Sequence, residues 1–306
     1  MFSQKIFNNN SCYISGLHRT GKSLLIGILP SVKKIGPINK DSSLGLISAM
    51  YINNEISYKS ARYLIRFIES NINYSNFIGR KINLKKSDET SIYKLQNYRK
   101  YLKKISKKKY KINENIKDDH ISFYDIHNIL SNLDFWKKTN ENFKLINLER
   151  NPVDLAYSWY QNKLGKYSKS SINQLLVYEF NKLLVPFYAK KWKAKFLRMK
   201  ELDRIIEILY QEITISNFNY RKKNNKKKIL RLKYENIILN PQKSLKKINT
   251  FLNIKSSINL NKYKKEININ KLVSNHMRLK KIKFIKKKCS DLYFKKLIKL
   301  ENEYNV

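Results

Sequence analysis

Residues 12–25 have the sequence CYISGLHRTGKSLL, and the organisation of the chain can be built outward from them. The apolar residues 12–15 predict a buried strand, and the apolar residues 24–26 predict the first turn of a helix. Residues 16–23 between them fit G-x-x-x-x-G-K-S, the pattern of a phosphate-binding loop. Strand, glycine-containing loop and helix follow in the order that such a site requires, so we expect this loop to bind phosphate.

The composition of this loop suits an anion. Gly21 lets the backbone curl so that successive N–H groups point inward, and the helix that follows adds its positive end. The lysine and arginine side chains supply positive charge, and the hydroxyl side chains supply hydrogen-bond donors. The residues expected to contact the phosphate are Gly16, Arg19, Thr20, Gly21, Lys22 and Ser23.

Further apolar runs alternate with helical patterns along the chain. Buried parallel strands are predicted at residues 12–15, 120–124, 144–148 and 228–233. Helices are predicted at residues 22–29, 45–68, 91–108, 129–138, 152–161, 173–196, 201–215, 241–252 and 293–303. The alternation predicts an α/β fold with a central parallel sheet flanked by helices on both faces. We expect a single domain over residues 1–306, with its core at 11–254 and a C-terminal helical extension at 255–306.

The chain is strongly basic. It has 306 residues, with 64 Lys and Arg against 23 Asp and Glu, and a formal net charge of +41. Such a charge raises the question of a nucleic-acid or other polyanion partner. However, the basic residues are mostly Lys scattered among Asn, Ile and Tyr, as an AT-rich genome would encode on solvated faces, and no RNP-like motif, zinc finger or basic zipper is present. We therefore expect no nucleic-acid partner.

The two cysteines, Cys12 and Cys289, are far apart in sequence and form no CxxC pair. This usage is typical of a reducing compartment and favours neither a structural zinc site nor a disulfide framework. Residues 1–10 lack the apolar segment of a signal peptide, and no run of 18 apolar residues is present to span a bilayer. The sequence thus predicts a soluble, cytoplasmic protein with Cys12 in its core.

A second candidate anion site follows the third predicted strand, where residues 149–160 read ERNPVDLAYSWY. Asn151 is a favourable N-cap, and Pro152 suits the first position of a helix. Arg150 would then stand at the carboxyl end of a strand, where open α/β sheets bind ligands, with Ser158 two turns further along the helix. We expect this site one nucleotide's length from the phosphate loop, on the same edge of the sheet.

Three segments resemble those of one enzyme family. The run R-N-P-x-D-x-x-x-S-x-Y at residues 150–160 resembles the 3′-phosphate motif of sulfotransferases, and residues 16–23 resemble their loop for the 5′-phosphosulfate. Residues 232–252, with LKYENII, then NP and L-x-x-I-x-x-FL, resemble the strand–helix segment of the family. The segments occur in the family order within residues 12–254. One departure is Lys22, which stands where the family usually has Ser or Thr.

The resemblance implies a sulfotransferase with the P-loop NTPase-like fold. Such an enzyme would transfer the sulfuryl group of 3′-phosphoadenosine 5′-phosphosulfate (PAPS) to a hydroxyl or an amine without a metal ion, leaving adenosine 3′,5′-bisphosphate (PAP). The 5′-phosphosulfate would be held by Arg19, Thr20, Gly21, Lys22 and Ser23. Arg150 and Ser158 would hold the 3′-phosphate, and Arg19 or Lys22 would stabilise the leaving oxygen. Glu235, in the third segment, would be structural.

The transfer also needs a base that takes the proton of the acceptor. In cytosolic family members this base is a His shortly after a strand, and His127 follows a predicted strand, 23 residues before Arg150. In membrane-type members it is a Glu after the first helix, a region in which this chain has Asp41 and Glu55. His120 is a further candidate. The alternative for His127 is a loop imidazole without a catalytic role.

The acceptor-binding parts are expected in residues 37–124 and 163–196, which correspond to variable regions of the family. The Tyr- and Lys-rich residues 93–110 suit a carbohydrate or glycoconjugate, although exposed helix faces have the same composition. Two other interpretations stay open. A P-loop kinase would need Mg²⁺ on an Asp at a strand end, for which Asp125 is the candidate. A non-enzymatic polyanion-binding protein would use the net charge alone.

Overall fold

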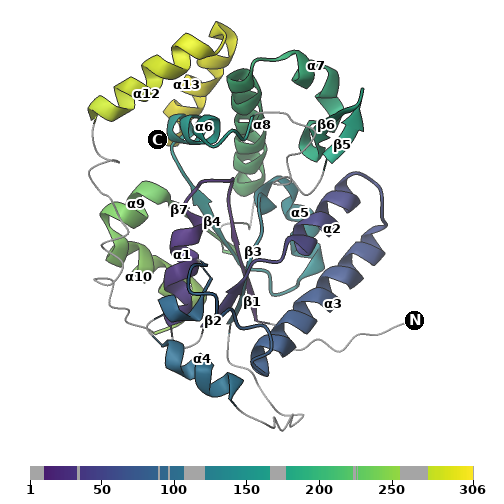
Figure 1. Ribbon diagram of the computed structural model, residues 1–306, viewed down its shortest axis with the longest axis vertical. Coiled ribbons are helices and arrows are strands. Elements are labelled where there is room, and N and C mark those ends of the chain that lie inside the picture. Colours follow the sequence, from purple (N-terminus) through teal and green to yellow (C-terminus); the bar gives the residue numbers. More distant parts are fainter. Residues whose placement is uncertain are drawn as a thin grey trace.

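The structure, a computed structural model, contains a parallel sheet with helices packed on it. The residues that it describes are 10–32, 35–88, 90–95, 97–106, 121–165, 177–222, 225, 227–255 and 275–305. Within them, five strands form one sheet in the order β2-β3-β1-β4-β7, and all neighbours are parallel (Figure 1). These strands are β1 (Ser11–Ser15), β2 (Ile35–Asn39), β3 (Ile121–Asp125), β4 (Leu145–Glu149) and β7 (Ile229–Lys233). A separate antiparallel pair consists of β5 (Val177–Phe180) and β6 (Leu183–Pro186). The predicted central parallel sheet is confirmed.

Helices account for most of the other described residues. The α-helices are α1 (Lys22–Ile28), α2 (Ser42–Ile52), α3 (Tyr58–Phe77), α4 (Tyr98–Ile105), α5 (Leu133–Thr139), α6 (Pro152–Gln161), α7 (Lys193–Arg198), α8 (Glu201–Arg221), α9 (Tyr234–Leu239), α10 (Pro241–Leu252), α12 (Asn275–Lys288) and α13 (Asp291–Asn305). The 3-10 helices are η1 (Leu29–Ser31), η2 (Ile92–Lys94), η3 (Ile129–Asn132) and η4 (Phe187–Trp192). α6 and α10 have the predicted bounds, because an Asn–Pro pair marks the start of each.

The helices cover both faces of the sheet, as predicted (Figure 1). On one face, α1 and α10 pack on Cys12 and Ile14 of β1. On the other face, α3 and α5 pack on Tyr13 of β1 and Tyr124 of β3. Cys12, Tyr13 and Ile14 are all fully buried, which explains why β1 is a continuous apolar run and confirms the core position of Cys12.

The strand β2 is the one strand of the described five-stranded sheet that the apolar runs did not indicate. Gly36 and Pro37 lie within it, and both residue types argue against a strand because glycine weakens it and proline donates no ladder hydrogen bond. Pro37 is tolerated because β2 lies at the edge of the sheet. The pairing of β2 with β3 also shifts its register between Ile35 and Ile38.

The helix predicted at residues 45–68 is instead two helices, α2 and α3. Asn54 between them has a left-handed φ of 60°. Ser57 then caps α3, since its Oγ accepts a hydrogen bond from the backbone N–H of Ser60 at 3.1 Å. Similar breaks replace the helices predicted at 91–108 and 129–138 by η2 with α4 and by η3 with α5, with residues 96, 107 and 108 outside the described part. Hydrophobic periodicity continued across these breaks and therefore did not reveal them.

The helix predicted at residues 173–196 is wrong. Residues 173–176 lie outside the described part, and the following residues form β5, β6, η4 and α7. Asn181 and Lys182 join the two strands with φ values of 52° and 60°, as a two-residue hairpin turn requires. Pro186 is also incompatible with a helix interior, because it has no N–H group and clashes with the preceding turn.

The helices α12 and α13 pack against α6 and α8. Their apolar side chains share one buried cluster with those helices. The terminal helix predicted at residues 293–303 corresponds to α13, and the Lys-rich α12 lies in the predicted helical extension, although no bounds were predicted for it. The limits proposed for the core and the C-terminal extension stay predictions. None of the described helices combines the length and the apolar character that a membrane span needs.

Candidate active site

The loop between β1 and α1 forms a tight cradle at the end of the sheet. Gly16, Arg19 and Gly21 have φ values of 139°, 67° and 92°, so the chain changes direction several times between β1 and α1. A Cβ atom on Gly16 would lie 2.3 Å from the carbonyl oxygen of Leu148 on β4, a contact that only glycine avoids. The loop therefore lies directly against the end of the neighbouring strand.

Gly21 leaves room for an aromatic ring to which the sequence patterns assigned no role. A Cβ atom on Gly21 would lie 2.2 Å from Cδ2 of Tyr234, the first residue of α9. The guanidinium carbon of Arg150 lies 4.9 Å from the centre of the same ring, in a cation–π contact. Tyr234 therefore supports both the glycine turn and Arg150. The available signal was its place directly after β7, since strand ends in α/β sheets face the ligand edge.

The two predicted anion sites meet at one edge of the sheet. β1 and β4 are parallel neighbours, so the residues that follow them emerge side by side. Arg150 donates from Nη1 to the backbone oxygen of Arg19 at 2.9 Å, and Arg19 donates from Nε to Oγ of Ser158 at 3.3 Å. The edge is the expected one, but the sites touch instead of standing one nucleotide's length apart, because the Arg150 side chain reaches back to the loop.

The donors of these two sites differ in their accessibility to an anion. Thr20 is buried, and its Oγ1 donates to the backbone oxygen of Leu17 at 2.9 Å, so this hydroxyl closes the loop. Ser23 is exposed on the first turn of α1. The Nε atom of Arg150 is buried and has no hydrogen-bond partner within the described ranges. Arg19 and Ser23 are exposed and Arg150 is partly exposed, so these residues present donors to an anion, although the Nε atom of Arg150 is itself covered.

Lys22 points beneath the loop. Its Nζ donates to the backbone oxygens of Gly16 and Leu17 at 3.1 Å and 3.3 Å, and only 6% of the side chain is exposed. Asp125 lies 3.9 Å away, at the end of β3. Burial lowers the pKa of Lys22 to about 8, although the charge of Asp125 acts in the opposite direction. The ammonium group therefore donates its hydrogen bonds to loop carbonyls, and reaching a bound phosphate would require it to leave them.

The imidazole of His127 lies next to Lys22, with 2.7 Å between Nδ1 and the Lys22 Nζ. An ammonium group can only donate, so Nδ1 accepts and the neutral ring carries its proton on Nε2. Desolvation, followed by the positive charge of Lys22, lowers the pKa of His127 below its ordinary value. The ring of His18 stacks on it with 3.8 Å between the centres. Nε2 can accept a proton only after Lys22 has released one and Nδ1 has gained one.

The other base candidates occupy different settings. Asp41 is the N-cap of α2, and its Oδ1 accepts a hydrogen bond from the backbone N–H of Ser43 at 3.0 Å. Glu55 is exposed in the connection between α2 and α3. His120 lies outside the described residues. His127, by contrast, contacts the loop through Lys22.

A tryptophan from the second motif also holds the loop, and the sequence patterns gave it no role. Trp159 of α6 donates from Nε1 to the backbone oxygen of His18 at 2.8 Å. The Trp159 side chain is otherwise buried in the core between α6 and α8. The helix that carries Ser158 is therefore linked to the loop through both Ser158 and Trp159.

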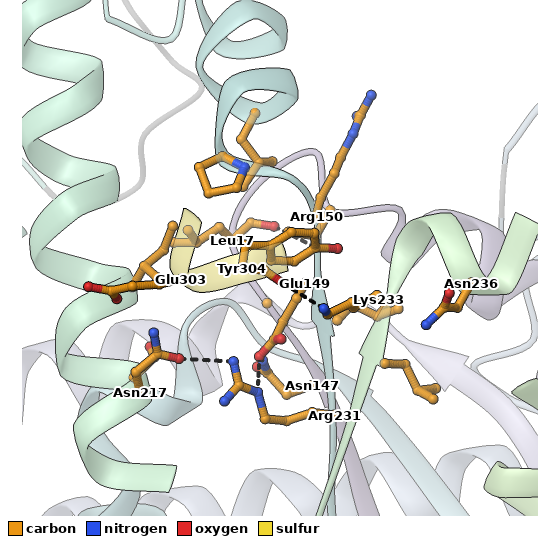
Figure 2. Close-up of a pocket in the computed structure, with 18 of the residues that line it drawn as sticks. Leu17, Asn147, Glu149, Arg150, Asn217, Arg231, Lys233, Asn236, Glu303 and Tyr304 are labelled. Carbon is orange, nitrogen blue, oxygen red and sulfur yellow. Dashed lines mark hydrogen bonds and ion pairs between the residues drawn. The ribbon is translucent and has the colours of Figure 1, made fainter. Parts of the chain in front are cut away.

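A cavity of about 460 Å³ with both polar and apolar lining lies beside the loop, between the ends of β4 and β7 and the helices α8 and α13. Arg231 on its floor forms an ion pair with Glu149, and Lys233 donates to the backbone oxygen of Tyr304 at 2.5 Å (Figure 2). The Arg150 side chain extends away from these groups (Figure 2). Arg231 and Lys233 are thus engaged by protein partners, whereas Arg150 is directed to the loop.

Known proteins resemble this chain in sequence and in structure. The sequence model of the sulfotransferase domain family matches residues 14–296. The sulfotransferase domain of the Synechococcus PCC 7002 olefin synthase is 13% identical with a TM-score of 0.44, covering 98% of this chain and 96% of that chain. A sulfotransferase from Alicyclobacillus acidocaldarius is 11% identical with a TM-score of 0.43, covering 97% of each chain.

A third solved structure, mouse sulfotransferase SULT7A1 in complex with PAP, is 15% identical with a TM-score of 0.39. That match covers 88% of this chain and 69% of the mouse chain. No curated protein matches the chain. The assignment to a family therefore rests on the domain match, which spans most of the sequence.

Proposed function

Because the chain belongs to the sulfotransferase family and is an enzyme of that family, we propose that it takes the sulfuryl group from PAPS and passes it to a hydroxyl or an amine. The observation that carries the choice of donor is the meeting of Arg19, Arg150 and Ser158 at one edge of the sheet. Two guanidinium groups from different strand ends suit a ligand with two separate anionic groups. PAPS carries a 3′-phosphate and a 5′-phosphosulfate, whereas all the negative charges of ATP lie on a single 5′-triphosphate.

Each end of the donor has its own set of residues in this proposal. Arg19 and the exposed Ser23 bind the 5′ end, with the turns at Gly16 and Gly21 and the Thr20 hydroxyl keeping the loop in shape. Arg150, through its partly exposed guanidinium, and Ser158 bind the 3′-phosphate. These are seven of the eight predicted binding residues, and the eighth, Lys22, takes a different role because it lies under the loop.

PAPS, when bound, supplies the sulfuryl group and a phosphate as the leaving group. Arg19 then places positive charge on the leaving oxygen, which is the largest contribution that the protein makes to such a transfer. In its charged form Lys22 donates to the loop carbonyls, and through its protonation it controls the imidazole of His127. This division gives Lys22 an indirect part in catalysis instead of the direct one that the resemblance implied.

His127 takes the proton of the acceptor in this proposal. The reactive form has a neutral Lys22 amine that accepts a hydrogen bond from Nδ1–H, which leaves the lone pair of Nε2 available. As the acceptor proton binds Nε2, the proton on Nδ1 passes to Lys22. The new positive charge then lies close to Asp125 and to the loop carbonyls, which stabilise it.

For the acceptor, we propose a carbohydrate or a glycoconjugate. Of the Tyr- and Lys-rich residues 93–110, Tyr93 is partly exposed, with Lys86 5.5 Å from its ring centre, and it remains suited to stacking on a sugar. Tyr101 is unsuited, because it is buried and its hydroxyl donates to the backbone oxygen of Pro30 at 3.3 Å. Residues 107–110 lie outside the described part of the chain.

Calorimetric titration with three ligands tests the donor. We expect PAP to bind tightly, with little change on addition of a chelator, and ATP with Mg²⁺ to bind far more weakly. Preference for ATP with Mg²⁺ would instead favour a kinase that uses Asp125 at the end of β3. Equal binding of both nucleotides, with oligonucleotide binding that falls steeply between about 50 and 200 mM salt, would favour the polyanion-binding alternative.

A further inference from the structure

The C-terminal helices share a core with α6, the helix that begins two residues after Arg150. The ring of Phe284 on α12 lies 5.4 Å from Tyr157 and 5.5 Å from Tyr160, measured between ring centres. The same buried cluster includes Val153, Leu155, Ala156, Trp159, Ile285, Tyr293, Leu297 and Leu300. The helices α12 and α13 are therefore packed on the helix that carries Ser158 and follows Arg150.

Asn151 connects this site to the C-terminal helices. Its Oδ1 caps α6 by accepting hydrogen bonds from the backbone N–H groups of Val153 at 2.9 Å and Asp154 at 3.4 Å. Its Nδ2 donates to Oε1 of Glu301 on α13 at 3.0 Å, and its backbone N–H donates to Oε1 of Glu235 on α9 at 3.1 Å. Asn151, the residue that follows the arginine, is thus held by contacts with α6, α9 and α13.

The partners of Asn151 are themselves held by α13. Glu301 is only 3% exposed, and Arg278 lies 2.8 Å from its carboxylate, which offsets the cost of burying the charge. The hydroxyl of Tyr304 donates to Oε2 of Glu235, and Lys233 donates to the backbone oxygen of Tyr304 at 2.5 Å. Two residues of α13, one turn apart, therefore act on both sides of the N-cap.

A further ion pair joins α12 to the first turn of α6. The Nζ of Lys281 lies 2.5 Å from Oδ1 of Asp154, and both side chains are about 15% exposed. An arginine side chain has several rotatable bonds, so the position of its guanidinium depends on a fixed backbone anchor. Recognition of a phosphate by arginine needs that group within hydrogen-bond distance and correctly oriented.

We propose that α13 is part of the 3′-phosphate site, with Glu301 and Tyr304 as positioning residues that orient Arg150 through Asn151 and Glu235. This inference rests on the proposed use of PAPS. Neither positioning residue touches the ligand. Together they hold the backbone from which the arginine extends, so the C-terminal helices determine whether the enzyme recognises the phosphate that distinguishes PAPS from other adenine nucleotides.

The test compares two ligands that differ only in the 3′-phosphate, PAP and adenosine 5′-monophosphate. For the full chain carrying Tyr304→Phe or Glu301→Leu, we expect the Kd of PAP to rise about tenfold, as loss of a hydrogen bond to a charged group predicts. The Kd of the monophosphate should not change. Glu301→Gln keeps an oxygen for the Asn151 amide and should restore most of the PAP affinity.

A matched control is available on the same helix. Lys296 of α13 forms an ion pair with Glu207 of α8 at 2.5 Å, away from the N-cap, so Lys296→Met should leave the Kd of both ligands unchanged. Thermal denaturation identifies any variant that fails to fold. If Glu301→Leu does not fold, the binding of PAP to Tyr304→Phe, which loses only one hydroxyl, tests the inference.

Unchanged PAP binding in Tyr304→Phe, or an equal loss for both ligands, would overturn the inference and leave α13 a purely structural helix. If the wild-type protein shows no preference for PAP over the monophosphate, the proposed function fails and the inference fails with it. If the wild-type protein prefers PAP over the monophosphate and the variants keep that preference, the inference fails but the proposed function stands.

Discussion

The two halves of the candidate site are built in different ways. The loop after β1 is shaped largely by residues within it, such as Gly16, Gly21 and the Thr20 hydroxyl on Leu17. The start of α6 depends on distant residues, because the hydrogen bonds from Asn151 reach partners 84 and 150 positions along the chain. The turns of the loop arise from its own residues, although Trp159 also holds it, whereas the contacts that Asn151 makes beyond its local N-cap exist only in the complete fold.

This contrast assigns different kinetic roles to the two arginines, and Arg19 should show the largest effect. Arg19→Ala removes the charge on the leaving oxygen, so we expect kcat to fall by about 10²–10³-fold, with a smaller change in the Kd of PAP. Arg19→Lys keeps the positive charge but loses the planar guanidinium, so its kcat should lie between those of the wild type and Arg19→Ala. A kcat that stays near the wild-type value, measured with saturating PAPS, would contradict the role of the loop.

His127 should show the next largest effect. His127→Ala removes the base, and kcat should fall by about 10²-fold. Turnover of labelled PAPS at nearly the wild-type rate would exclude His127 as the base. Asn128 is a suitable control position, because it follows His127 and its amide donates to Glu212 instead of facing Lys22.

The pH dependence of kcat tests the link between His127 and Lys22. The reactive form has one proton fewer on this pair, so activity should rise with pH and level off above the Lys22 pKa of about 8. Lys22→Ser restores the residue type usual in the family and removes the cation, so the midpoint should fall below about 6.5, the ordinary value for histidine, because burial still lowers the pKa of His127. An identical profile in the two proteins would show that Lys22 does not control the imidazole.

Arg150 should affect binding more than chemistry. Arg150→Ala removes a charged donor to the 3′-phosphate, and we expect the Kd of PAP to rise about 10–100-fold while kcat at saturating PAPS changes little. Adenosine 5′-monophosphate serves as the control ligand, and its Kd should be unaffected. Equal losses of kcat and affinity in the Arg19 and Arg150 variants would erase the distinction between the two halves of the site.

Ser158 should have the smallest effect. Ser158→Ala removes one neutral hydroxyl, so the Kd of PAP should rise by about two- to tenfold. Ser158 also accepts a hydrogen bond from Arg19, so a loss of kcat in this variant would show that the second half helps to position the first. Steady-state kinetics at varied PAPS concentration separates the two parameters.

Much of the fold could be predicted because its signals are local. β1 and β4 are buried along most of their length and β3 and β7 in part, so all four appear as runs rich in apolar residues. β2 was not predicted because Pro37 argues against a strand unless that strand lies at the edge of a sheet. The local sequence of β2 does not reveal that it occupies an edge. The hairpin of β5 and β6 was missed because Asn181 and Lys182 adopt left-handed conformations that periodicity does not record.

The sequence by itself determined the loop and the Asn–Pro start of α6, because the glycines, the N-cap and the proline act on their own neighbours. Only the tertiary structure decided where the side chains point. Lys22 lies under the loop because β3 brings Asp125 and His127 beneath it. Arg150 meets the loop because β1 and β4 are adjacent, and α13 reaches Asn151 because apolar burial docks it on α6. Such contacts join residues far apart in the chain, and no local pattern specifies them.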